Sequence, residues 1–159
     1  MSQQSSNALG AVVVDVNILL AICTKELKEQ TARVAIADYA TRNWQFYAPG
    51  LIVGEFLFIA CQKLQLGALT KASYDNAVED FKDYMTIISP PPGGEASLIV
   101  RAKETQSGYG CSRSADCMYV ALTEELAKSG AAELLTFDGG MVNQAAKNAP
   151  KVKINLLPV

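Results

Sequence analysis

The chain has 159 residues, of which half are hydrophobic and 19% are charged, and its formal net charge is -2. This length fits one domain with a sizeable core, and no apolar run reaches the roughly 18 to 20 residues of a membrane span. The sequence contains no histidine, which excludes Ser-His and Cys-His nucleophile systems, imidazole metal sites and histidine general bases.

The start of the chain and its cysteines indicate the cellular setting. Residues 1–10 are polar and contain no basic residue, so we expect a flexible tail followed by a single domain over 11–159, with no signal peptide or membrane anchor. The four cysteines, Cys23, Cys61, Cys111 and Cys117, form no closely spaced pair. Buried, reduced thiols in a cytoplasmic protein are the predicted state.

Apolar strand-like runs alternate with helical patterns along the whole chain. In chain order we expect a strand that begins at Ala11 and ends near Asp15, a short helix over 18–22, a helix over 25–41, a strand over 44–48, helices over 51–61 and 71–84, a strand over 86–89, helices over 95–106 and 112–128, a strand over 133–137, a helix over 141–147 and a last strand over 152–157. This alternation predicts an α/β fold with three layers, α/β/α, around a central parallel sheet of about five strands.

For two of the helices the sequence also predicts which faces are buried. The helix over 25–41 is predicted to be amphipathic, with Leu27, Val34 and Ala37 on one face. The helix over 51–61 is apolar nearly all round, which predicts burial on every side. Its only charge is Glu55, which we expect either to pair with a distant basic residue or to face a polar cavity or a cation.

The first strand contains one carboxylate in an apolar run. No Lys or Arg lies within nine residues of Asp15, and burying an unpaired charge is costly. A structural explanation is that Asp15 or Asn17 caps the following helix. A functional explanation is an acidic ligand at the carboxyl edge of a central strand, where open α/β sheets usually place their sites.

Three further acids are predicted to lie at the same edge of the sheet. Glu55 is early in the helix after the second strand, Asp116 is in the first turn of a helix, and Asp138 directly follows the fourth strand. Individually, the helix dipole explains Asp116 and a cap explains Asp138. Together with Asp15, they are better explained by a shared cation, because ionised carboxylates do not crowd together without one.

The chemistry of such a site follows from its oxygen ligands. Carboxylates favour the hard ions Mg²⁺ and Mn²⁺, and such an ion activates water and stabilises displacement at phosphorus. A bound cation also lets an acidic protein engage a polyanion. From the residues alone we therefore predict a divalent-metal phosphodiesterase or nuclease of α/β type.

The same residues resemble a known family. The run VDVNILL over 14–20, the acid Glu55, the block ADCMYVAL over 115–122 and the segment LTFD over 135–138 are similar to PIN-domain ribonucleases, most nearly the VapC-like toxins of toxin-antitoxin pairs. The resemblance spans residues 11 to 157.

The resemblance implies a metal-dependent endoribonuclease. Asp15, Glu55 and Asp116 would be its metal-site and catalytic acids and Asp138 a fourth, with Asn17 and Thr136 as supporting polar residues. It also implies attack of water on phosphorus that leaves a 3'-hydroxyl and a 5'-phosphate, a small antitoxin protein that blocks the groove, and a homodimer.

Three other classes of protein share part of this sequence pattern. A phosphoacceptor receiver domain needs an acceptor Asp after the third strand, where Ser89-Pro90 stands, and a dinucleotide site needs a glycine-rich turn after the first strand. The alternative that stays open is a PIN-fold module that binds RNA or a partner protein without cutting. Lys25, Arg113 and Arg42 are the candidates to contact RNA phosphates.

Overall fold

A five-stranded, all-parallel sheet lies at the centre of the computed structural model, which describes residues 7–111 and 115–159. Its order is β3-β2-β1-β4-β5. The strands are β1 (Gly10–Val14), β2 (Trp44–Tyr47), β3 (Ile88–Ser89), β4 (Ala132–Thr136) and β5 (Lys153–Leu156). Each neighbouring pair runs in parallel, so the predicted sheet is confirmed, with β1 beginning one residue before the expected domain start.

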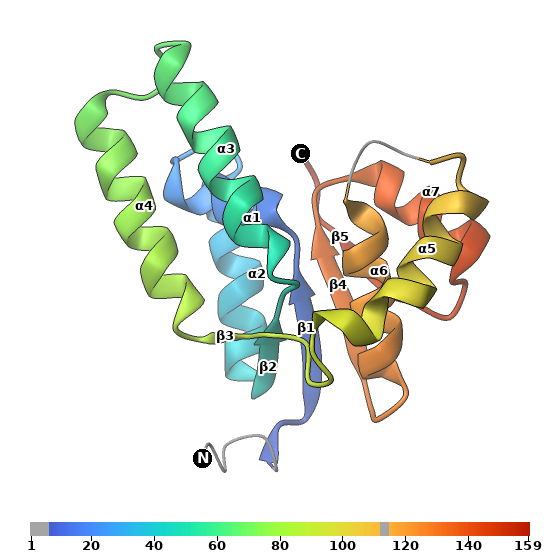
Figure 1. Cartoon of the computed structure of the whole chain (residues 1–159). Coiled ribbons are helices and arrows are strands. Elements are labelled where there is room, and N and C mark those ends of the chain that lie inside the picture. Colours follow the sequence, from blue (N-terminus) through green and yellow to red (C-terminus); the bar gives the residue numbers. More distant parts are fainter. Residues whose placement is uncertain (1–6, 112–114) are drawn as a thin grey trace.

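Helices cover both faces of the sheet, as Figure 1 shows. One face carries α1 (Val16–Cys23), α2 (Glu29–Thr41), α3 (Leu51–Gln65) and α4 (Lys71–Met85). The other carries the 3-10 turn η2 (Glu95–Leu98), α5 (Ile99–Gly108), α6 (Asp116–Ala127) and α7 (Gly139–Asn148). The three-layer α/β/α architecture is therefore the predicted one.

The alternation of side chains along β1 builds a separate core on each face. Val12 and Val14 pack into the core beneath α1 to α4, whereas Val13 packs into the core beneath α5 to α7, and all three are fully buried. Successive strand residues point to opposite faces, so a strand covered on both sides reads as a continuous apolar run.

The site is positioned by the connections that leave β1 and β4. The chain runs from β1 through α1 and α2 to β2 on one side, and from β4 through α7 to β5 on the other side. The two connections cover opposite faces of the sheet, and the carboxyl ends of strands at such a point are where open α/β sheets place their sites. Asp15 directly follows β1, and Asp138 follows β4 after one intervening residue, Phe137.

The structure corrects the predicted face of α2. The helix begins at Glu29, four residues later than expected, and its buried residues are Ala32, Ala35 and Tyr39. Leu27 is fully exposed and Val34 is also exposed. The helix packs through the small residues Ala32 and Ala35 and through the ring of Tyr39, which lie on a different face from the predicted one.

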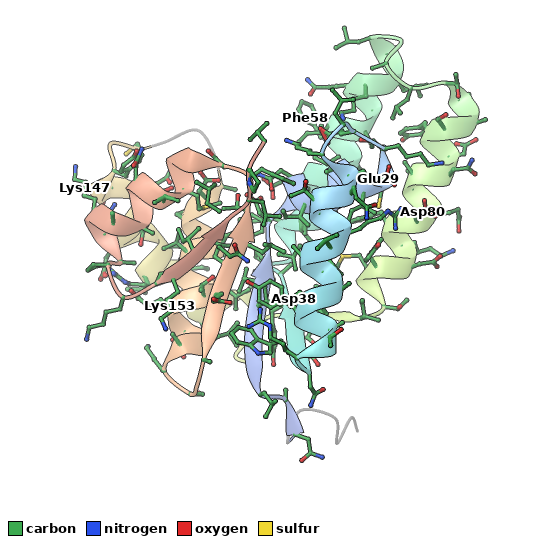
Figure 2. All side chains as sticks on the ribbon, turned by 180° about the vertical axis from the view of Figure 1, so that it is seen from behind. Glu29, Asp38, Phe58, Asp80, Lys147 and Lys153 are labelled. Carbon is green, nitrogen blue, oxygen red and sulfur yellow. The ribbon has the colours of Figure 1, made fainter. Side chains whose placement is uncertain are left out.

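The prediction that α3 is buried on every side was wrong. Its buried residues are Ile52, Phe56 and Ala60, spaced four apart along one stripe. On the outer face Phe58 is 64% exposed (Figure 2) and Leu57 is also exposed. The hairpin of α3 and α4 projects from the sheet, so only one side of α3 meets the core.

The cysteines are free but not all buried. Cys23 is buried and Cys117 is intermediate, whereas Cys61 and Cys111 are exposed, which corrects the prediction of four buried thiols. None of the helices in the described ranges is long and apolar enough to span a membrane.

Candidate functional site

Asp15 lies at the centre of the site, between the carboxyl end of β1 and the start of α1. Its side chain is only 5% exposed. The hydroxyl of Thr136, the last residue of β4, donates to Asp15 Oδ2 at 2.7 Å. Burial, together with the negative charges of Asp116 and Glu55, raises the pKa of Asp15 from 3.8 to about 7, against the lowering effect of the Thr136 hydrogen bond. Asp15 occupies the N-cap position of α1 without a side-chain capping bond.

Thr136 links Asp15 to its surroundings. Its Oγ1 accepts from Asn17 Nδ2 at 3.2 Å and from the backbone N–H of Asp138 at 2.9 Å. Asn17 Oδ1 in turn accepts the backbone N–H of Phe137 at 3.2 Å. A hydroxyl has one donor and two acceptor positions, and all three are used here. The structure thus places Asn17 and Thr136 beside the acid, where the sequence predicted them as supporting residues.

Glu55 reaches the same region from α3. It lies one turn into the helix, is partly buried, and accepts a hydrogen bond from the hydroxyl of Tyr119 at 2.6 Å. Burial and the nearby charge of Asp116 raise the pKa of Glu55. The acid therefore faces a polar partner and another acid, with no basic residue paired to it through any ion pair within the described residues.

Asp116 completes a set of three neighbouring acids. It is the first residue of α6, and its charge raises the pKa of both Asp15 and Glu55. Since Glu55 also raises the pKa of Asp15, each acid of the three acts on another. The structure brings together carboxylates that are separated by 40 and 61 residues in the sequence.

Asp138 has a different place from the other acids. Its Oδ1 accepts the backbone N–H of Gly140 at 2.8 Å, so it caps α7. The capping explanation weighed from the sequence is therefore confirmed. A direct role of Asp138 as a fourth acid of the site stays a prediction.

Sequence reasoning overlooked Tyr119. This residue is 1% exposed, and it lies one turn after Asp116 on α6. Residues three apart on a helix share a face, so the spacing from Asp116 was a usable signal. Its partner Glu55 lies 64 residues away in the sequence, and no local pattern indicates that contact.

The donor set fits a hard cation in its chemistry, but it is not arranged as a ligand cage. The three carboxylates offer only oxygen atoms, and the charge of Asp116 raises the pKa of both Asp15 and Glu55, a repulsion that a bound cation would offset. Across residues 7–111 and 115–159, no group of three or more Asp, Glu, Cys or His is arranged so that it could hold a metal ion. Asp15 and Glu55 have one carboxylate oxygen each on Thr136 and Tyr119.

The three basic residues predicted to contact RNA lie in different parts of the chain. Lys25 is exposed in the loop after α1, with a left-handed φ of 54°. Arg113 lies outside the described residues. Arg42 follows the end of α2 and stacks on Trp44 at 4.8 Å. Because Trp44 begins β2, Arg42 lies at the amino edge of the sheet, away from the acids, which corrects its selection.

Comparisons with known proteins bear on the fold. No family model and no curated protein matches the chain. Among solved structures, a chain from the VapBC2 complex of Rickettsia felis, crystallised with a DNA fragment from its promoter, superposes with a TM-score of 0.63 at 10% sequence identity. The match covers 92% of this chain and 98% of that chain. The chain therefore shares the fold of that chain, in agreement with the three-layer, PIN-like fold that the sequence resemblance implied.

Proposed function

We propose that the protein is a divalent-metal-dependent endoribonuclease, with Asp15, Glu55 and Asp116 as its acidic centre. One observation carries this proposal. Asp15, Glu55 and Asp116 come from three different parts of the fold and lie near enough for their charges to interact, and this repulsion adds to the effect of burial in raising the pKa of Asp15 to about 7. Structural caps do not require such repulsion, whereas a bound cation would offset it.

Each residue of the site has its own role in the proposed reaction. A bound Mg²⁺ or Mn²⁺ would supply charge stabilisation at the phosphate and a more acidic water. Asp15, Glu55 and Asp116 would hold the ion, with Asp138 as a fourth acid at the rim. Thr136 and Asn17 keep Asp15 in place through the hydrogen bonds described above. Lys25 and Arg113 would contact the phosphates of the RNA.

The biological setting is proposed from the fold relative. That protein is crystallised as a two-component complex, and we propose that this chain is likewise the toxin of a toxin-antitoxin pair, with a small antitoxin that covers the acidic centre. A homodimer and a cytoplasmic location belong to the same proposal.

Cleavage of RNA is the direct test. Purified protein is incubated with a mixed, end-labelled RNA in Mn²⁺, in Mg²⁺ and in EDTA, beside Asp116→Asn as the control for contaminating nucleases. We expect cutting that needs the metal and is lost in Asp116→Asn. Cutting that persists in the variant would assign the activity to a contaminant.

A second candidate function rests on a specific observation. Because no described group of three acids is arranged to hold a metal ion, the domain could bind RNA or a partner protein without cutting it. An absence of cleavage together with a melting temperature that does not respond to Mn²⁺ would favour this binding module.

A further inference from the structure

Tyr119 connects the elements that carry the three acids. Its hydroxyl donates to Glu55 Oε1 of α3 at 2.6 Å. The backbone of Val16, the first residue of α1, also acts on this hydroxyl and lowers its pKa, against the larger opposite effect of burial. Val16 directly follows Asp15, and Tyr119 itself lies on the helix that begins with Asp116.

The surroundings make this contact specific. Tyr119 is 1% exposed, and its ring packs in the core beneath α5 to α7. A tyrosine hydroxyl is protonated at neutral pH, so it acts as the donor to the Glu55 carboxylate. A short hydrogen bond from a neutral donor to a carboxylate is among the stronger ones in proteins.

We propose that Tyr119 is a positioning residue for the acidic centre, which holds the Glu55 carboxylate at a set place relative to Asp15 and Asp116. This inference rests on the proposed metal-dependent function. One oxygen of Glu55 is engaged by Tyr119, so the position and rotation of the carboxylate are restricted before any cation binds. Partners that orient metal ligands in this way typically contribute about 10- to 100-fold to metal affinity.

The test compares two identical substitutions at buried tyrosines. Tyr119→Phe removes only the hydroxyl that reaches Glu55. Tyr39→Phe is the matched control, because Tyr39 is also fully buried and donates to a glutamate, Glu133 Oε2, at 2.9 Å near the start of β4. Mn²⁺ affinity is measured by titration calorimetry, and the melting temperature of the metal-free protein is measured for each variant.

The expected result is a loss of Mn²⁺ affinity of about 10- to 100-fold in Tyr119→Phe and an unchanged affinity in Tyr39→Phe, whatever their melting temperatures. Combining Tyr119→Phe with Glu55→Gln should weaken binding little beyond Glu55→Gln alone, because both changes act on one carboxylate. Equal Mn²⁺ affinity in wild type and Tyr119→Phe would overturn the inference and leave the proposed function intact. Absence of Mn²⁺ binding by the wild type would overturn the proposed metal function itself, and the inference with it.

Discussion

A single buried carboxylate, Asp15, dominates the electrostatics of the site. Its folded pKa of about 7 lies above the ordinary value of 3.8, so between these two values the folded protein binds more protons than the unfolded chain. Stability of the metal-free protein therefore falls as the pH rises from about 4 to about 7, and the full cost remains above that range. Glu55 changes stability in the same direction, because its pKa is also raised.

The first prediction concerns Asp15→Asn. An amide keeps an oxygen for Thr136 but carries no charge, so the variant should stabilise the metal-free protein by a few kcal/mol at pH 8 and by much less at pH 5. Thermal melts in EDTA across this pH range measure the effect, with the exposed acid Asp83 changed to Asn as the control. A gain of equal size at both pH values would contradict the predicted cause.

The second prediction concerns Thr136→Val. The substitution keeps the shape of the side chain but removes the donor to Asp15 and the acceptor for Asn17 and for the Asp138 backbone. Since Thr136 is fully buried, leaving these groups unpaired should cost about 1 to 3 kcal/mol or more. Denaturant unfolding measures the loss, and Thr136→Ser, which keeps the hydroxyl, should lose clearly less. Similar losses in the two variants would show that the missing hydroxyl is not the cause of the loss in Thr136→Val.

At the scale of elements, the helices differ in how the backbone N–H groups at their N-terminal ends are satisfied. The cap of α7 is the side chain of Asp138, and the cap of α4 is Thr70, whose hydroxyl accepts the N–H of Ser73 at 3.0 Å. α1 has no such side-chain cap. The residue at its N-cap position, Asp15, instead accepts a hydrogen bond from Thr136 at 2.7 Å.

The third prediction tests the cap of α7. Asp138→Ala should destabilise the protein by about 0.5 to 2 kcal/mol because the Gly140 N–H loses its acceptor. Asp138→Asn should be close to wild type, because asparagine caps as well as aspartate. Denaturant unfolding of both variants distinguishes them, and an equal loss in both would show that the charge of Asp138 matters more than its capping bond.

The fourth prediction concerns the contact between three helices on one face. Arg101 of α5 donates to both carboxylate oxygens of Glu124 on α6, at 2.6 and 3.1 Å, and to the backbone oxygen of Asn148 at the end of α7. The pair is partly exposed, so we expect Arg101→Ala to cost only about 1 kcal/mol. Arg101→Lys should recover little of this, because an ammonium lacks the two-pronged geometry. Unfolding in high salt provides the check, and full recovery by lysine would contradict the geometric explanation.

At the scale of the whole molecule, the four cysteine thiols differ in how far they are exposed to solvent, so their reactivity measures how tightly each region is packed. Cys61 lies on the exposed face of α3 and Cys111 in a loop, whereas Cys23 is 3% exposed and burial raises its pKa to about 12.

The fifth prediction is an order of labelling by a thiol reagent at neutral pH. Cys61 and Cys111 should react first, Cys117 more slowly, and Cys23 only as fast as the protein unfolds, because only the exposed thiolate reacts. Mass spectrometry of digested samples measures each rate. Fast labelling of Cys23 without added denaturant would contradict the tight packing of α1.

How far the sequence predicts the molecule depends on the kind of contact. Asp15 and Asp138 were assigned to one edge because each directly follows a strand, and parallel strands end together. The faces of α2 and α3 were not predictable in this way. An almost wholly apolar helix such as α3 has no polar stripe to mark its outside, and α2 packs through the small residues Ala32 and Ala35 while Leu27 stays exposed.

The sequence by itself determined the alternation of strands and helices, the parallel sheet and the acids at its carboxyl edge, because hydrophobic periodicity and the direction of crossover connections are local or general rules. Only the tertiary structure decided that Tyr119 reaches Glu55, that Thr136 holds Asp15, and that Asp138 turns to α7. The first two contacts join residues 64 and 121 positions apart. Their geometry depends on how whole helices pack on the two faces of the sheet, which no local pattern encodes.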